Sequence, residues 1–191
     1  CVFFAKCIMQ KLWLQELDWD DSLPPELETE WLKYVSELKL LSKFRHERQV
    51  TVSQHSYYQI LGFSDASILG YAAAVYLRSL NDAGDVKVSL VVAKSRVAPT
   101  RTRSIPRLEL QGALLLAQLV DYTKSILCQR IPVHETFLFT DSTVVLAWLN
   151  TPTYKLQTYV ATRVSKVLDL SPVEGWYHVE GACNPADVCS R

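Results

Sequence analysis

The hydrophobic and polar positions of the chain change period near residue 55. Before this point, apolar residues recur every three or four positions between Leu27 and Leu41, which predicts an amphipathic helix opened by SLPPE (22–26). Residues 1–20 contain a further apolar segment, so we expect this whole N-terminal part to be helical. Three strand-like runs follow: YYQILGFSD (57–65), YAAAVYLR (71–78) and VKVSLVVAKS (86–95). Because short turns join them, these runs predict an antiparallel meander.

The second half of the chain alternates helices with strands. Ser104 and Pro106 predict the start of a long helix, with the serine as its N-cap and the proline in its first turn. The later elements are a strand at 136–141, a short helix at 142–150, a helical pattern at 156–168, a strand at 175–181 and a helix start at NPAD (184–187). A meander followed by this alternation predicts an α/β fold with a mixed sheet flanked by helices.

Composition narrows the possible functions. Twenty Lys and Arg residues balance twenty Asp and Glu residues, so any binding of nucleic acid must depend on local clusters of charge. Five cysteines without a C-x-x-C pair disfavour a disulfide framework or a zinc site and fit a reducing, intracellular setting. The sequence predicts neither a membrane span nor a secretory signal. The first residue is not Met and the chain stops within an expected helix, so we expect part of a longer protein with a truncated C-terminal helix.

Two carboxylates stand at positions where an acid is unusual. Asp65 ends the first strand in phase with Leu61 and Phe63, which predicts that it projects from the same side as core residues; an aspartate in a turn is the alternative. Glu109 lies on the long helix, where a role in favouring the helix start is the alternative. Its neighbours on that face are small or apolar: Gly112, Ala113, Leu116 and Val120. An acid on such a face carries a desolvation cost that the helix start does not explain.

Two further acids, Asp141 and Asp187, can each be explained by a helix start. Asp141 ends TFLFTD and could cap the next helix, although Ser142 could do so as well. Asp187 is expected near the third position of the final helix. If the first and fourth strands are neighbours, Asp65 and Asp141 meet at adjacent strand ends and Glu109 reaches them from the crossing helix. A pair of divalent cations would keep four such charges close, and hard oxygen ligands favour Mg²⁺ or Mn²⁺.

Several motifs in this order resemble one protein family. FSDAS (63–67), IPRLELQGALLLA (105–117), FTDSTVVLAWL (139–149) and WYHVEGACNPADVCSR (176–191) are similar to the ribonuclease H domain of BEL/Pao-type retrotransposon polyproteins. LWLQELDWDDSLPPELETEW (12–31) resembles the connecting segment that follows the reverse transcriptase in those polyproteins. The resemblance implies a ribonuclease H-like fold with a five-stranded mixed sheet over residues 51–191, preceded by a helical connection segment over residues 1–50.

The resemblance also implies an activity and its partners. It implies cleavage of the RNA strand of RNA/DNA hybrids during reverse transcription, with two Mg²⁺ ions, or Mn²⁺ as substitute, held by Asp65, Glu109, Asp141 and Asp187. The expected partners are the hybrid, the reverse transcriptase and the other domains of the polyprotein, inside a virus-like particle in the cytoplasm. Many ribonucleases H add a histidine before the last aspartate; His178 is the nearest candidate here, but WYHV places it in a strand, which favours a structural role.

A basic stretch next to the Glu109 helix suggests how the substrate is held. Six basic residues and no acid occur between Val86 and Leu108: Lys87, Lys94, Arg96, Arg101, Arg103 and Arg107. The last five are expected in the segment that joins the third strand to the helix, where they would neutralise phosphates; a solvated loop is the alternative. Four hydroxyl groups could bond to phosphate or to the ribose 2′-OH, those of Ser64, Ser67, Ser142 and Thr143. Trp148 and Trp176 are expected in the core.

Three other functions are alternatives to hybrid cleavage. A catalytically inactive, structural ribonuclease H-like module is the main alternative. An aspartic peptidase needs a D-[ST]-G turn, but Asp141-Ser142 is followed by Thr143, so peptidase activity is disfavoured. Recombinase or integrase chemistry uses the same type of fold, and the basic segment and the order of the acids favour hybrid cleavage over it.

Overall fold

The computed structural model describes residues 2–15, 17–45, 47–52, 56–101 and 103–190. The chain divides into two compact units, Cys1–Arg48 and Gln49–Arg191, and each is described by itself. Among the described residues, none of the helices combines the length and apolar character that a membrane span requires. Four of the five cysteines lie in the described part, and all four are free thiols: Cys7, Cys128, Cys183 and Cys189.

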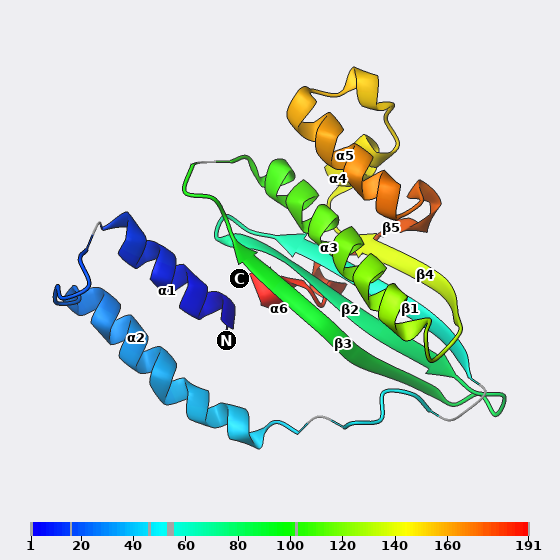
Figure 1. Ribbon diagram of the computed structural model, residues 1–191, viewed down its shortest axis with the longest axis horizontal. Helices are drawn as coiled ribbons and strands as arrows, with labels where there is room; N and C mark the ends of the chain where they lie inside the picture. Colours follow the sequence, from blue (N-terminus) through cyan, green and yellow to red (C-terminus); the bar gives the residue numbers. More distant parts are fainter. Residues whose placement is uncertain (1, 16, 46, 53–55, 102, 191) are drawn as a thin grey trace. The chain divides into compact units, whose positions relative to one another are not determined.

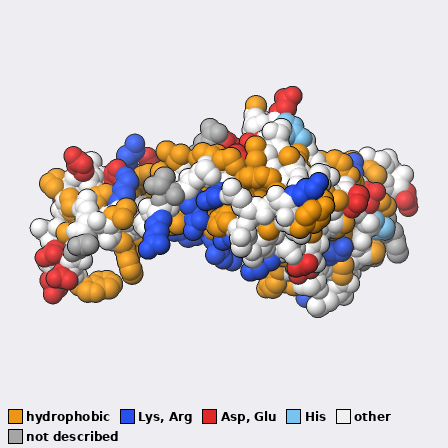
Figure 2. Space-filling model, turned by 90° about the horizontal axis from the view of Figure 1, so that it is seen from above, with side chains coloured by type: hydrophobic (Ala, Val, Ile, Leu, Met, Phe, Trp, Pro, Cys, Tyr) orange, Lys and Arg blue, Asp and Glu red, His pale blue; other side chains and the backbone are white. Residues whose placement is uncertain are grey.

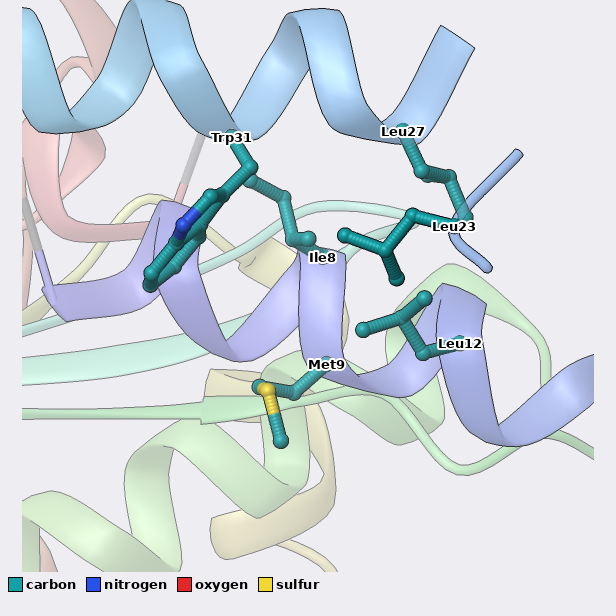
Figure 3. Close-up of a pocket in the computed structure, with 6 residues that line it drawn as sticks. All are labelled: Ile8, Met9, Leu12, Leu23, Leu27 and Trp31. Carbon is teal, nitrogen blue, oxygen red and sulfur yellow. The ribbon is translucent and has the colours of Figure 1, made fainter. Parts of the chain in front are cut away.

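The first unit is a pair of helices. α1 (Val2–Leu14) packs against α2 (Pro25–Leu38), which continues into a 3₁₀ turn, η1 (Lys39–Lys43). Apolar side chains from both helices and from the connection between them line a pocket, namely Ile8, Met9, Leu12, Leu23, Leu27 and Trp31 (Figure 3). Lys11 and Glu30 form a salt bridge of 2.8 Å between the two helices. The amphipathic pattern predicted for α2 is only partly buried, because Leu27 is covered whereas Trp31 is 38% exposed.

The second unit contains the predicted five-stranded mixed sheet. The strands are β1 (Tyr57–Ala66), β2 (Gly70–Leu80), β3 (Val86–Val97), β4 (Val133–Thr140) and β5 (Trp176–His178). Their order is β3-β2-β1-β4-β5 (Figure 1). β1 to β3 form an antiparallel meander, whereas β1, β4 and β5 run parallel to one another. The predicted meander and the predicted mixed sheet are therefore confirmed.

Helices flank this sheet. They are α3 (Ile105–Leu127), α4 (Thr143–Leu149), α5 (Thr158–Leu170) and α6 (Asp187–Ser190), with 3₁₀ turns η2 (Thr153–Lys155), η3 (Val173–Gly175) and η4 (Gly181–Cys183). α3 crosses one face of the sheet over β1 and β2, and α5 packs against α3 (Figure 1). The core lies between these layers. Trp176 is buried in it and Trp148 packs against it, as predicted.

Two glycines allow α3 to lie very close to the strands. A Cβ atom on Gly62 of β1 would come within 2.8 Å of Leu116 Cδ1 on α3. A Cβ atom on Gly112 of α3 would come within 3.2 Å of the Asp65 carbonyl oxygen. Glu109 is one helical turn before Gly112, so this close approach brings Glu109 to the end of β1 that carries Asp65.

The structure confirms Ser104 at the N-cap position of α3 and changes the position predicted for Asp187 in α6. Ser104 occupies the N-cap position of α3, but its side chain makes no capping hydrogen bond; its carbonyl oxygen accepts from the backbone N–H groups of Arg107 and Leu108. Asp187 is the first residue of α6 and not its third. The two residues before α6 form a turn, in which the Asn184 Oδ1 atom accepts from the Ala186 N–H at 3.1 Å and the Asn184 carbonyl oxygen accepts from the Asp187 N–H at 3.1 Å.

Candidate active site

The pairing of β1 with β4 brings two of the predicted acids together. The strands are parallel, and Ser64 lies opposite Thr140. The next residue of each is an aspartate, so Asp65 and Asp141 occupy neighbouring positions at the carboxyl ends of adjacent strands. The strand adjacency on which the prediction depended is therefore confirmed.

Asp65 is a buried carboxylate close to two other acids, Asp141 and Asp187. Its side chain is 4% exposed. Burial raises its pKa to about 6, and the charges of Asp141 and Asp187 act in the same direction, whereas a hydrogen bond from Ser190 lowers it. A protein rarely holds an acid this way for stability alone.

The burial of Asp65 has a different origin from the one predicted. Residues of β1 on the α3 side are buried, among them Ile60 and Ser64, whereas Leu61 and Phe63, in phase with Asp65, are only half-buried. Asp65 therefore does not share the core face of its strand. The contact with α6, through Ser190, covers it instead.

Glu109 is tied to the same edge of the sheet through Ser142. The Ser142 hydroxyl donates to Glu109 Oε2 at 2.5 Å, and its oxygen accepts from the Val145 N–H at 3.2 Å, which caps α4. Because Ser142 directly follows Asp141 in the chain, this bond ties Glu109 to the segment that carries Asp141. The predicted cap of α4 is confirmed as Ser142, which leaves Asp141 without a capping role.

The serines predicted to contact nucleic acid are engaged within the protein. Ser142 is buried and bonded to Glu109. Ser64 is buried as well, and its hydroxyl lies 3.4 Å from the Phe139 carbonyl oxygen. The Ser67 hydroxyl donates to the Ser190 carbonyl oxygen at 2.6 Å. These three hydroxyl groups therefore have partners within the protein, and their contact with nucleic acid stays a prediction. Thr143, the first residue of α4, is exposed.

The C-terminal segment places Asp187 near Asp65. Asn184 is buried, and its Nδ2 atom donates to the Ser64 carbonyl oxygen at 2.9 Å. Upstream of it, Gly181 lies against Asp141: a Cβ atom there would be 3.3 Å from Asp141 Oδ2. The segment is thus fastened along the edge that carries both strand aspartates, and Asp187 raises the pKa of Asp65 from this position.

His178 ends β5 opposite Thr140 and is exposed, so it lies beside the strand end that leads to Asp141.

The donor set fits hard divalent cations, although the side chains do not surround one point. Among the described residues, no three His, Cys, Asp or Glu side chains form a group ready to bind one metal ion. The structure brings Asp65 and Asp141 together as a pair. Asp187 is close enough to raise the pKa of Asp65, and Glu109 is linked to the same edge through its hydrogen bond with Ser142. Mg²⁺ and Mn²⁺ prefer oxygen ligands, and either ion would offset the repulsion between these negatively charged carboxylates.

The predicted basic loop is shorter than expected. β3 pairs with β2 as far as Val97, so Lys94 and Arg96 are exposed residues of a strand. α3 begins at Ile105, so Arg107 belongs to the helix. Only Arg101 and Arg103 lie in the connection itself. The prediction of five basic residues in that loop was wrong, because strand pairing and helix formation extend further into the segment from both sides.

Three arginines instead surround one tyrosine, and we call this group the arginine–tyrosine cluster: Arg103, Arg107, Arg163 and Tyr159. The three guanidinium carbons lie 4.9, 5.0 and 3.5 Å from the centre of the Tyr159 ring, for Arg103, Arg107 and Arg163 respectively. The Gln111 amide lies 2.8 Å from the Tyr159 hydroxyl. The sequence reasoning missed Tyr159 and Arg163, whose only signal is a spacing of four residues on one helix.

The cluster has more positive charge than its partners neutralise. Within the described ranges, no carboxylate forms a salt bridge with any of its three arginines. The Nε atom of Arg103 is buried without a hydrogen-bond partner. Arg107 and Gln111 flank Glu109 on α3, so the cluster lies at the same end of this helix as the acids. On the face drawn in Figure 2, Lys and Arg side chains gather in local groups, although the formal net charge is zero.

The five-stranded mixed sheet, in the order β3-β2-β1-β4-β5, is that of a ribonuclease H-like domain. The family model described as "Pao retrotransposon-like RNaseH-like domain" matches residues 1–142, and the chain belongs to this family. The family resemblance noted from the motifs is therefore confirmed. No match was found among the curated proteins.

The chain is also similar to several solved structures. RNase H1 from the halophilic archaeon Halobacterium salinarum is 16% identical over 69% of this chain and 92% of that chain, with a TM-score of 0.39. LC11-RNase H1, in complex with an RNA/DNA hybrid, is 11% identical over 69% and 91%, with a TM-score of 0.39. The foamy viral protease-reverse transcriptase, in complex with double-stranded DNA, is 15% identical over 93% of this chain and 34% of that chain, with a TM-score of 0.47.

Proposed function

We propose that this domain cleaves the RNA strand of RNA/DNA hybrids in a metal-dependent reaction, as part of a retrotransposon polyprotein. Membership of the RNase H-like family gives the class of domain. The observation that carries the proposal is the position of Asp65 and Asp141 at the ends of adjacent parallel strands, with Glu109 tied to the same edge. A carboxylate whose pKa is raised by burial and by neighbouring charges is typical of functional sites, and Asp65 is such a group.

Asp65, Glu109, Asp141 and Asp187 would hold two Mg²⁺ ions, with Mn²⁺ as a substitute. Bound there, the ions would supply an activated water and charge stabilisation for the departing 3′-oxygen. The chain's own residues set the geometry: Ser142 orients the Glu109 carboxylate, and Asn184 fastens the segment that carries Asp187. The buried position of Asp65 limits its freedom to turn toward solvent.

The arginine–tyrosine cluster would bind phosphates of the substrate. A guanidinium group can donate two parallel hydrogen bonds to one phosphate, and no carboxylate among the described residues forms a salt bridge with the three arginines of the cluster. Stacking against Tyr159 fixes the orientation of the arginines before the substrate arrives. The side chains of Arg101, Lys94 and Arg96 remain candidates for further phosphate contacts. The partners in this proposal are the hybrid, the reverse transcriptase and the other polyprotein domains, within a cytoplasmic virus-like particle.

A cleavage assay tests this function. The purified chain is incubated with a hybrid whose RNA strand carries a 5′ label, in buffer with Mg²⁺. We expect internal cleavage of the RNA strand, loss of cleavage when EDTA removes the metal, and recovery when Mg²⁺ or Mn²⁺ is restored. Double-stranded DNA of the same sequence is the control and should remain intact. Absence of cleavage with either metal would favour the inactive structural module.

A further inference from the structure

Ser190 makes an unusual contact in the candidate site. It is completely buried, and its hydroxyl donates to Asp65 Oδ2. The same hydroxyl oxygen lies 3.1 Å from the Asp187 carbonyl oxygen. One side chain therefore links the carboxylate at the end of β1 to the helix that carries the fourth acid.

Ser190 is itself held in place from the other side. Its carbonyl oxygen accepts from the Ser67 hydroxyl at 2.6 Å, and Ser67 in turn accepts from the Leu69 N–H at 3.1 Å. The connection between β1 and β2 thus fixes the end of α6. A hydroxyl donor fixed in this way has little freedom to turn from Asp65, which is the property that distinguishes a positioning group from a chance contact.

We propose that Ser190 is a positioning residue that orients the Asp65 carboxylate for metal binding. The inference rests on the proposed function, because it takes Asp65 to be a metal ligand. A carboxylate that binds a metal through one oxygen is held in plane when a hydroxyl donates to the other, and the loss of such outer partners weakens metal binding by roughly 10- to 100-fold in well-studied sites. Ser190 also offsets part of the repulsion that Asp65 receives from Asp141 and Asp187.

Metal binding to the full chain tests the inference without depending on catalysis. Isothermal titration calorimetry with Mn²⁺ is carried out on the unmodified chain, on Ser190→Ala and on Ser171→Ala. Ser171 is the matched control, since it is also a buried serine, and its hydroxyl bonds to Val167 and Trp176 in the core and not to an acid. Thermal unfolding without metal is measured for all three proteins, which shows whether each variant is folded.

We expect the Ser190→Ala variant to bind Mn²⁺ about tenfold more weakly or worse, and the Ser171→Ala variant to bind it like the unmodified chain. Equal affinity in the folded Ser190→Ala variant would reduce Ser190 to a packing role, and tighter binding would mean that its hydroxyl competes with the metal; either result overturns the inference. Asp65→Asn separates this failure from that of the proposed function. If Asp65→Asn leaves Mn²⁺ binding unchanged, Asp65 is no metal ligand and both proposals fall.

Discussion

The Asp65→Asn variant is expected to lose hybrid cleavage by about a thousandfold or more. The substitution keeps the size of the side chain but removes the charge that would hold a divalent cation. A metal ion stabilises the transition state by several kcal/mol, and each 1.36 kcal/mol lost lowers the rate roughly tenfold, so loss of the metal gives a factor of this size. The measurement is kcat on a labelled hybrid at saturating Mg²⁺.

The matched control for this variant is Asp121→Asn. Asp121 is an exposed acid on α3, the helix that also carries Glu109, so the control removes one negative charge outside the carboxylate edge. Its activity should equal that of the unmodified chain. Cleavage by Asp65→Asn at more than about a tenth of the normal rate would show that the metal site lies elsewhere.

The same variant should be more stable than the unmodified chain when no metal is present. Burial and neighbouring charges raise the pKa of Asp65 from 3.8 to about 6, so an ionised Asp65 destabilises the folded state above pH 6, and this cost disappears below about pH 4. After allowance for solvent screening we expect a gain of order 1 kcal/mol, or about 2 to 4 °C in Tm, at pH 7.5. Thermal unfolding in EDTA from pH 4 to 8 measures it, and a gain that grows toward low pH would have the wrong sign.

The double variant Arg103→Gln/Arg107→Gln is expected to weaken substrate binding with a smaller effect on the chemical step. Two phosphate contacts would be lost, so KM for the hybrid should rise about tenfold or more at physiological salt, and the slope of log KM against log salt should fall by about 1 to 2. Steady-state kinetics at several salt concentrations give both quantities. Gln is polar but shorter than Arg and uncharged, so each substitution removes the guanidinium group while keeping a polar side chain.

Arg130→Gln is the control for this pair. Arg130 is exposed and lies just beyond the opposite end of α3, so its loss changes the net charge of the chain without touching the arginine–tyrosine cluster. Its KM and salt slope should stay close to those of the unmodified chain. If the control and the double variant shift KM per charge by the same amount, the cluster acts only through the general field of the protein.

The parts of the site that follow from strand order could be predicted from the sequence. Period-two alternation located β1 and β4, and each strand ends next to an acid, so the meeting of Asp65 and Asp141 needed only the assumption that the strands are neighbours. Glu109 could be predicted as a site residue because packing does not explain an acid on a helix face that also carries Gly112 and Ala113. In each case the signal is local, within one strand or one helix.

The remaining contacts depend on packing between elements far apart in the chain. Tyr159 meets Arg103 only because α5 packs against α3, and no local pattern reports this pairing. Ser190 meets Asp65 across 125 positions in the chain. The lengths of β3 and of the basic connection also differ from the prediction, because the pairing of β3 with β2, a tertiary property, continues to Val97 beyond the predicted strand end at Ser95.

The most direct test of the central claim, that the acids hold a pair of metal ions, is anomalous diffraction from a crystal of the chain soaked in Mn²⁺. Two manganese peaks are predicted at the carboxyl ends of β1 and β4, bridged by Asp65, with Glu109 and Asp141 among the ligands. Manganese bound only elsewhere, with these carboxylates turned away from any shared ion, would contradict the claim.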